Sequence, residues 1–255
     1  MVPPPSSSRP PWVRVALVVA ALVLLAAGGA YALDALERRP SSGFAIPALD
    51  VEPGAAAPAT SSGESTTEWT AAVADRTEIP ARALRAYVDA DRKTRATSPD
   101  CRISWATLAG IGRVESHHGT LGGLALGEDG RPSSPIVGIP LDGSPGVRAI
   151  EDSDRGVLDG DGRWDRAVGP MQFIPTTWAI YAVRASGDGR PPDPQNIDDA
   201  ALAAANYLCA AGKDLSTGAG WWQAVMTYNN SVEYGRKVFS GADAYAKAAS
   251  APPTT

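Results

Sequence analysis

The feature that most limits how this chain can fold is an uncharged apolar run near its start. Residues 15–33 read VALVVAALVLLAAGGAYAL and contain no charged side chain. A helix of that length extends about 28 Å, which is close to the thickness of the hydrocarbon core of a bilayer. We therefore expect a transmembrane helix over residues 15–33, preceded by a short N-terminal segment of residues 1–14.

The charges beside this run set its expected orientation. Arg9 and Arg14 precede it, whereas the charged residues directly after it cancel one another. By the positive-inside rule, the N-terminus stays in the cytoplasm and the rest of the chain lies outside. A cleaved signal peptide is the alternative, because Ala30-Tyr31-Ala32 fits a cleavage site. The run is longer than the apolar segment of a usual signal peptide, which favours the uncleaved anchor.

Composition divides the remainder into a linker, one domain and a tail. Residues 34–67 are rich in Pro, Ala, Ser, Thr and Gly, and we expect a disordered linker there. Residues 68–248 form one domain of ordinary size, and residues 249–255 a disordered tail. The net charge of −5 argues against a nucleic-acid partner, which would require a basic face.

The two cysteines of the chain, Cys101 and Cys209, both fall within the domain. Outside the cytoplasm, where conditions are oxidising, such a pair is expected to form a structural disulfide. Two separate buried thiols are the alternative.

Apolar residues at helical spacing predict a mainly α domain. The expected helices are 80–94, 105–118, one that opens at 175, 198–211, 221–228 and 232–246. Residues 120–167 show no helical period and are rich in Gly, Pro and Asp. Loops of this length in a compact domain are often functional. We expect an ordered, irregular loop that includes at most a short hairpin.

One carboxyl group interrupts the apolar face of the helix predicted at 105–118. On a helical wheel, Glu115 falls between Leu108 and Ile111, on the stripe that should face the core. Burial there raises the pKa of a carboxyl and keeps a proton available near neutral pH, as a general acid requires. A structural ion pair with Arg113 or another arginine is the alternative.

The sequence contains four separated motifs, and the first of them includes Glu115. They are Glu115-Ser116; Gly169-Pro170-Met171-Gln172 followed by FIPTTW; Asp193-Pro194 followed by a helix that contains Tyr207-Leu208; and Tyr228-Asn229. In this order they resemble the motifs of the soluble-type and membrane-bound B-type lytic transglycosylases, bacterial enzymes that cleave murein. The resemblance covers residues 79–238. It implies a lysozyme-like domain of the goose-type lysozyme/transglycosylase kind that acts on peptidoglycan glycan strands.

The resemblance also implies a role for each matching residue. Glu115 is the implied single catalytic acid/base, which protonates the bond between N-acetylmuramic acid and N-acetylglucosamine and then promotes closure of the C6 hydroxyl onto C1. The product is a 1,6-anhydromuramoyl end. The implied substrate-binding residues are Ser116, Met171, Gln172, Tyr207, Tyr228 and Asn229. For Tyr207, on an Ala-rich helix, a role in the core is the alternative.

The sequence leaves two alternatives to this function open. One is a muramidase-type hydrolase that uses water and a second carboxylate. Another is a non-catalytic murein-binding or scaffold module, whose protein partners the sequence does not identify. The expected location is the bacterial cytoplasmic membrane, with the domain outside the cytoplasm, or secretion if the N-terminal segment is cleaved.

The sequence has two clusters of potential metal ligands, and neither indicates a required cofactor. Calcium at Asp152, Asp154, Asp159 and Asp161 is one interpretation of the acidic loop, but the EF-hand spacing fails there, and Asp/Gly turns explain the pattern equally well. His117 and His118 are adjacent on the expected helix and point about 100° apart, so they cannot chelate one metal together. We expect both histidines to be polar surface residues near the cleft.

Overall fold

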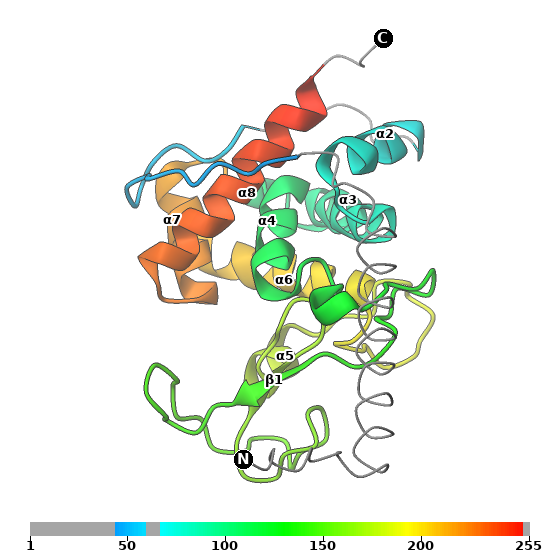
Figure 1. Cartoon of the computed structure of the whole chain (residues 1–255), viewed down its shortest axis with the longest axis vertical. Coiled ribbons are helices and arrows are strands. Elements are labelled where there is room, and N and C mark those ends of the chain that lie inside the picture. Colours follow the sequence, from blue (N-terminus) through cyan, green and yellow to red (C-terminus); the bar gives the residue numbers. More distant parts are fainter. Residues whose placement is uncertain (1–43, 60–66, 252–255) are drawn as a thin grey trace, which may run out of the picture. The chain divides into compact units, whose positions relative to one another are not determined.

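The computed structural model of the chain describes residues 44–59 and 67–251 (Figure 1). Most of the described residues from Thr67 onward are helical, which confirms the prediction of a mainly α domain. The helices are α2 (Thr67–Thr77), α3 (Ala81–Thr97), α4 (Trp105–Ser116), α5 (Pro175–Tyr181), α6 (Ile197–Gly212), α7 (Gly218–Tyr228) and α8 (Val232–Ser250), with short 3-10 helices η1 (Pro99–Cys101) and η2 (Leu121–Gly123).

The predicted transmembrane helix at 15–33 and the segment 1–14 lie outside the described residues, as do 34–43, 60–66 and 252–255. Within the described ranges, every helix is too short or too polar to cross a bilayer. The domain begins at Phe44, where a compact unit starts that extends through the rest of the chain.

Helix α4 lies in the middle of the domain and packs closely against α8 (Figure 1). Gly110 allows this approach, because a Cβ atom at this position would lie 2.6 Å from the carbonyl oxygen of Val238. Helix α3 packs on α6, and α6 on α7. Because α4 is surrounded by other helices, its C-terminal end is held in a fixed place relative to the start of α8.

Helix α4 begins where the sequence predicts and ends earlier. The Ser104 side chain accepts a hydrogen bond from the Thr107 backbone N–H and caps the helix. The helix ends at Ser116 because His117 and His118 both adopt positive φ, 50° and 62°. The expected extension to 118 is therefore wrong by two residues.

The long loop at 120–167 is ordered, as expected, and it contributes a short antiparallel pair. β1 (Val137–Pro140) pairs with β2 (Arg166–Val168), with Val137 opposite Val168. Between the strands, Asp side chains accept hydrogen bonds from nearby backbone N–H groups; Asp154, for example, accepts from Val157 and Leu158. In this segment, Asp turns of this kind satisfy backbone N–H groups that a β-ladder would otherwise pair.

Part of the linker that was predicted to be disordered is ordered in the structure: residues 44–59 lie against α8. The Phe44 ring stacks on Tyr245 at 5.7 Å, and the Leu49 backbone N–H donates to Ser240 Oγ at 3.0 Å. Arg236 donates to the carbonyl oxygen of Val51. The physical reason is that apolar residues recur along this segment and cover apolar surface of α8, which offsets the entropy lost on ordering.

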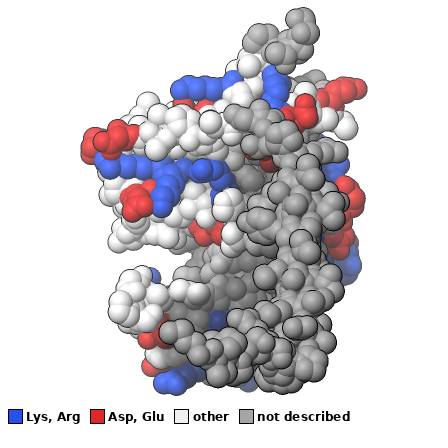
Figure 2. Space-filling view, in the orientation of Figure 1, with Lys and Arg blue, Asp and Glu red and all other residues white. Residues whose placement is uncertain are grey.

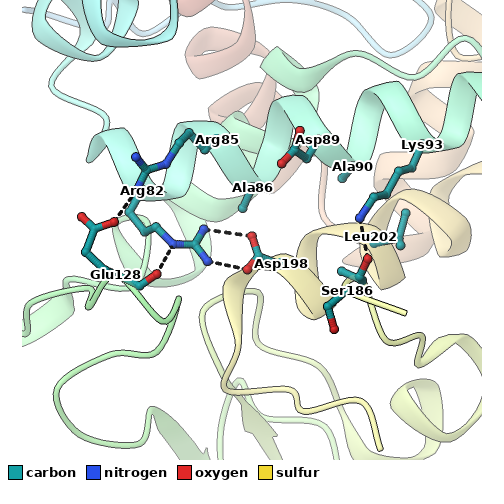
Figure 3. Close-up of a pocket in the computed structure, with 11 residues that line it drawn as sticks. Arg82, Arg85, Ala86, Asp89, Ala90, Lys93, Glu128, Ser186, Asp198 and Leu202 are labelled. Carbon is teal, nitrogen blue, oxygen red and sulfur yellow. Dashed lines mark hydrogen bonds and ion pairs between the residues drawn. The ribbon is translucent and has the colours of Figure 1, made fainter. Parts of the chain in front are cut away.

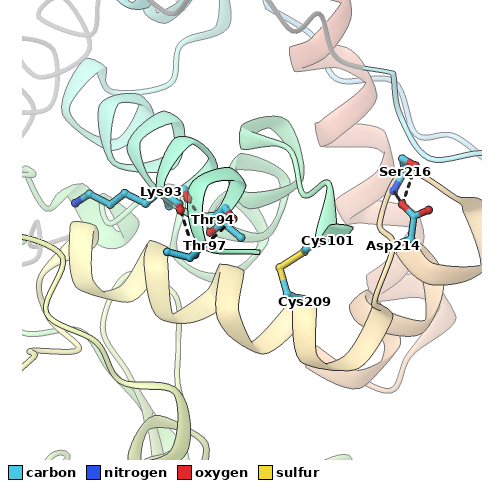
Figure 4. The surroundings of a disulfide bond; sticks show 8 residues. Lys93, Thr94, Thr97, Cys101, Cys209, Asp214 and Ser216 are labelled. Carbon is cyan, nitrogen blue, oxygen red and sulfur yellow. Dashed lines mark hydrogen bonds between the residues drawn. A yellow bond between two sulfur atoms is a disulfide. The ribbon is translucent and has the colours of Figure 1, made fainter. Parts of the chain in front are cut away.

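The expected disulfide is present between Cys101 and Cys209, whose Cα atoms are 5.3 Å apart (Figure 4). It joins η1 to the last turn of α6 across 108 residues of sequence. The alternative of two separate thiols is thereby excluded.

Candidate active site

The candidate site is built around Glu115, in the last turn of α4. Its side chain is half-buried, and its Oε1 accepts a hydrogen bond of 2.5 Å from the Tyr234 hydroxyl of α8. Within the described residues no arginine pairs with it, so the alternative of an ion pair with Arg113 is not what the structure shows.

The surroundings of Glu115 raise the pKa of its carboxyl group. Burial disfavours the charged form and raises the pKa of Glu115 to about 7, and the hydrogen bond from Tyr234 offsets part of this effect. At neutral pH the protonated and ionised forms are therefore both well populated. Such a group can donate a proton to a leaving oxygen and accept one afterwards.

Ser116 lies next to Glu115 in sequence but has a different environment. It is fully buried, and its hydroxyl donates to the carbonyl oxygen of Pro170 at 2.6 Å while accepting from the Gly119 backbone N–H. These bonds tie the end of α4 to the segment 169–172. The structure thus places Ser116 as a link between two motifs.

The Gly-Pro-Met-Gln segment forms a tight turn that faces this helix end. Gly169 has a φ of 76°, and a Cβ atom there would overlap the Pro194 carbonyl oxygen, so only glycine fits. Met171 is fully buried. Gln172, half-buried and with a φ of 50°, donates from its amide to the Gly169 carbonyl oxygen and lies against Gly138 of β1.

Tyr228 and Asn229 end α7 beside this turn. The Tyr228 hydroxyl donates to the Met171 carbonyl oxygen at 2.7 Å. Burial raises the pKa of Tyr228 well above its ordinary value, and the nearby charge of Glu115 adds to this effect. Asn229 is exposed, and its backbone N–H caps α7. Tyr228 therefore holds the Met-Gln turn in place near the carboxyl.

Tyr207 belongs to a row of three aromatic rings. Its ring centroid lies 5.5 Å from that of Tyr228 and 4.8 Å from that of Tyr181. Its hydroxyl donates to the Thr227 carbonyl oxygen, and its side chain is partly exposed. Tyr207 thus packs against the core on one side and remains accessible on the other.

The elements that carry these residues lie beside a hollow in the surface. Figure 2 shows it between α7 and α8 on one side and the loop that carries β1 on the other. Glu115 and Tyr228 belong to the helical side, whereas Gln172 contacts the β1 side. Helix α4, whose last turn carries Glu115, packs against α8 on the helical side of this hollow.

Sequence reasoning missed Tyr234, the residue in direct contact with Glu115. Its side chain is 7% exposed, and it occupies the first turn of α8, where the Ser231 side chain caps the helix by accepting from its backbone N–H. The serine cap a few residues after Tyr228-Asn229 is a signal that a new helix starts beside the site.

The expected surface position of the two histidines is wrong for His118. Its ring is buried between two tyrosines, with Nδ1 3.2 Å from the Tyr87 hydroxyl and Nε2 3.0 Å from the Tyr245 hydroxyl. Burial lowers the pKa of His118 to about 3, so the ring is neutral. The early end of α4 turns this side chain inward, whereas His117 is exposed.

The acidic loop brings together a different set of carboxylates from the one expected. Oxygen atoms of Asp152, Asp154 and Asp165 lie within 4.8 Å of one another, the set that the described residues offer to a hard cation. Asp159 and Asp161 instead accept bonds from Arg166, through its backbone N–H and its guanidinium respectively. Asp165 is fully buried and accepts from Ser153, so hydrogen bonds within the loop also satisfy it.

Comparison with known proteins gives one family match and two similar solved structures. Residues 147–235 match the family model described as "Transglycosylase SLT domain". No curated protein matches the chain. Two solved structures are similar, both of the Escherichia coli lytic transglycosylase Slt35. In its complex with bulgecin A the identity is 16%, with 71% of this chain and 78% of that chain covered and a TM-score of 0.41. In its complex with calcium the identity is again 16%, with 71% of this chain and 79% of that chain covered and a TM-score of 0.39.

Both TM-scores lie below 0.5, so the identification rests on the sequence match. Residues 147–235 match a transglycosylase SLT domain, which confirms the resemblance to lytic transglycosylases and supports an enzyme of this kind. Lytic transglycosylases need no cofactor, in agreement with the expectation of none.

Proposed function

We propose that this lytic transglycosylase cleaves the β-1,4 bond between N-acetylmuramic acid and N-acetylglucosamine and forms a 1,6-anhydromuramoyl end, with Glu115 as its single acid and base. The observation that carries the proposal is the half-buried carboxyl of Glu115, whose pKa is about 7. The family match begins at residue 147, after Glu115. The assignment is therefore supported by the contacts of Glu115 and by the motifs around it.

The reaction needs one carboxyl group because the substrate supplies the other reacting groups. Glu115 first gives its proton to the glycosidic oxygen, and the bond from that oxygen to C1 of the muramic acid breaks. The acetamido group of the substrate stabilises the positive charge that develops at C1. The Glu115 carboxylate then takes the proton of the C6 hydroxyl as O6 forms a bond to C1. Glu115 ends the cycle protonated, and no water is consumed.

The neighbouring side chains keep this carboxyl and the sugar in position. Tyr234 donates to Glu115 and stabilises its ionised form after the first proton transfer. Tyr228 holds the backbone of Met171, the residue next to Gln172. The Gln172 amide and the exposed Asn229 side chain have donors and acceptors for sugar hydroxyls.

A hydrolase of the muramidase type is the second candidate, and it would need a second carboxylate to activate water. Within the described residues, burial and Tyr234 account for the pKa shift of Glu115, and no other carboxyl contributes to it. This favours the anhydro reaction. A non-catalytic murein-binding module would gain nothing from a carboxyl group whose pKa lies near neutral pH.

Product analysis tests the proposal directly. Purified sacculi are digested with the full chain, and the soluble muropeptides are analysed by mass spectrometry. We expect fragments that end in 1,6-anhydromuramic acid, lighter by one water than reducing-end products. Reducing ends would show a hydrolase instead, and binding to sacculi without soluble product would show a murein-binding module.

Membrane anchoring is a separate proposal, supported by the apolar run at 15–33 and the arginines before it. The domain then acts outside the cytoplasm, tethered to the cytoplasmic membrane. Alkaline carbonate washing of membranes from expressing cells should leave the full chain in the membrane fraction. A soluble product whose N-terminus follows Ala32 would show cleavage of a signal peptide.

The pH dependence of the reaction should change in Tyr234→Phe. The hydrogen bond from Tyr234 lowers the pKa of Glu115, so its loss should raise that pKa above about 7. Because Glu115 acts first as an acid, kcat/KM falls as pH rises through its pKa. We expect the alkaline limb of kcat/KM to move up by about one pH unit.

The matched control for this prediction is Tyr245→Phe, which removes another buried hydroxyl from the same helix. Its partner is His118, so the alkaline limb should stay in place. An unmoved limb in Tyr234→Phe, or one displaced to lower pH, would contradict the coupling of Tyr234 to Glu115.

A further inference from the structure

The three residues that follow the Glu115-Ser116 pair have an unusual backbone conformation. His117, His118 and Gly119 all have positive φ, of 50°, 62° and 84°. Glycine adopts this conformation readily, but in the two histidines the Cβ atom crowds the backbone. A run of this kind persists only where the surrounding structure holds it, and such strain is concentrated at functional sites. The left-handed turn that these three residues form must therefore be held by other contacts.

The His118 ring makes two of these contacts. It is 5% exposed, and it lies between Tyr87 of α3 and Tyr245 of α8. Both ring nitrogens have a partner, the Tyr87 hydroxyl at 3.2 Å from Nδ1 and the Tyr245 hydroxyl at 3.0 Å from Nε2. Because the ring is neutral, one nitrogen donates a hydrogen bond and the other accepts one. The proposed reaction does not use this ring, and its contacts point to a role in holding the turn.

Helix α4 makes room for this arrangement at Gly112. A Cβ atom there would overlap the Tyr87 hydroxyl, so only glycine allows that hydroxyl to approach the helix and reach His118. The carbonyl oxygen of Gly112 also accepts a hydrogen bond of 2.9 Å from the His118 backbone N–H. The same residue of α4 thus contacts the backbone of His118 and a partner of its ring.

The two tyrosines belong to helices that are themselves fixed. Helix α3 packs on α6, and Figure 3 shows the guanidinium of Arg82 on α3 bonded to both carboxylate oxygens of Asp198 on α6. Tyr87, on the same α3, is fully buried. Helix α8 packs on α4, and its Tyr245 ring stacks on Phe44 at 5.7 Å. The ring between the two tyrosines is therefore held from both sides.

The left-handed turn is bonded directly to the residue after Glu115. The Ser116 carbonyl oxygen accepts from the Gly119 backbone N–H at 3.1 Å, and Ser116 Oγ accepts from the same N–H at 2.8 Å. The Ser116 hydroxyl also donates to the carbonyl oxygen of Pro170. A displacement of the turn would therefore displace Ser116, and with it the carboxyl of Glu115.

Helix α8 contacts the end of α4 at two places. Tyr234 donates to Glu115, and Tyr245 contacts His118. From their positions in α8, the two tyrosines are about 20° apart around the helix axis and share one face. The same face of α8 thus contacts the carboxyl and the turn that follows it.

We propose that His118 is a positioning residue: its two hydrogen bonds hold the left-handed turn, and the turn keeps the carboxyl of Glu115 in its half-buried place against Tyr234. The inference rests on the proposed role of Glu115 as acid and base. A general acid works only within hydrogen-bond reach of the leaving oxygen, so a small displacement of the carboxyl lowers the rate more than it weakens binding. Burial is the larger cause of the raised pKa of Glu115, so a displaced and more exposed carboxyl would have a lower pKa.

The pKa of Glu115 in His118→Phe tests the proposal without any reaction. Phenylalanine keeps a buried aromatic ring but bonds neither tyrosine. The pKa is measured by carbon-13 NMR on the full chain in detergent, with labelled glutamate, and the Glu115 signal is assigned by its absence from Glu115→Gln. We expect a pKa of about 7 in the wild type and a value lower by about one unit in His118→Phe. An unchanged pKa would overturn the proposal.

Kinetics provide a second readout, because a purely structural role would lower the amount of folded enzyme without moving its pH profile. In His118→Phe we expect kcat per folded enzyme to fall about tenfold with KM nearly unchanged. The alkaline limb of kcat/KM should move to lower pH, opposite to its movement in Tyr234→Phe. His118→Gln, whose amide can bond one tyrosine, should recover part of kcat. A fall in kcat with an unmoved limb would show a structural role alone and overturn the proposal.

His117→Phe is the matched control, since it makes the same change at the neighbouring residue of the turn. His117 is exposed, and within the described residues it is bonded through its backbone groups. Its kcat and its alkaline limb should match the wild type.

Two further variants keep the test decisive. If His118→Phe does not fold, Tyr87→Phe/Tyr245→Phe removes both hydrogen bonds and keeps every ring. The pKa of Glu115 should fall in this pair and stay in place in Tyr245→Phe, which retains the bond to Tyr87; an unchanged pKa in the pair would overturn the proposal. A lowered pKa together with undiminished product release by Glu115→Gln would support the positioning of the carboxyl and overturn the proposed function.

Discussion

Glu115→Gln should reduce the release of anhydro-muropeptides from sacculi by about 10³-fold, within the range that general acid-base groups contribute. Glutamine has the shape of glutamic acid but cannot give up a proton to the glycosidic oxygen. Its amide oxygen can still accept the hydrogen bond of the Tyr234 hydroxyl, so the contact between α4 and α8 remains. The measurement is product release per enzyme, with far-UV circular dichroism and thermal unfolding to show that the fold is intact.

Glu233→Gln is the matched control for this prediction. Glu233 lies in the first turn of α8, next to Tyr234, but it is exposed and pairs with Lys237. The same change of charge and shape should therefore leave product release near the wild-type value. Undiminished release by Glu115→Gln would remove Glu115 as the catalytic acid and direct the search to the carboxylates of the long loop.

The position of Glu115 could be predicted because it depends on one helix. Helical periodicity places it between Leu108 and Ile111, and both of these are fully buried in the structure. The start of the same helix follows from the Ser104 cap. Both inferences involve residues a few positions apart, where the geometry of the α-helix determines which side chains share a face.

The partner of Glu115 could not be predicted, because its contact joins two helices far apart in sequence. Tyr234 lies 119 residues after Glu115 and meets it only because α8 crosses the end of α4. His118 illustrates the same limit. Its burial between Tyr87 and Tyr245 depends on where α4 ends and on helices that the local sequence does not specify.

Composition predicted the linker at 34–67 and could not indicate where its ordered part begins. The segment from Phe44 is rich in small residues, yet Phe44, Leu49 and Val51 find apolar surface on the domain. In the acidic loop, the pairing of β1 with β2 closes the chain on itself. That closure brings Asp165 near Asp152 and directs Asp159 toward Arg166, which spacing along the sequence cannot show.

Removal of the disulfide, in Cys101→Ala/Cys209→Ala, is expected to lower the free energy of unfolding by about 4 kcal/mol. The bond closes a loop of 108 residues, and in the chain-entropy model a loop of this length gives a contribution of roughly that size. A domain of this size is stable by only about 5–15 kcal/mol, so the loss is a large fraction of the total. The measurement is urea unfolding followed by circular dichroism.

The control for this double variant is the wild-type chain unfolded in the presence of reductant, which should show the same loss of stability. Alanine at Cys101, which is 4% exposed, also removes a buried sulfur, so the variant should be slightly less stable than the reduced wild type. A variant as stable as the oxidised wild type would show that the bond does not constrain the unfolded chain.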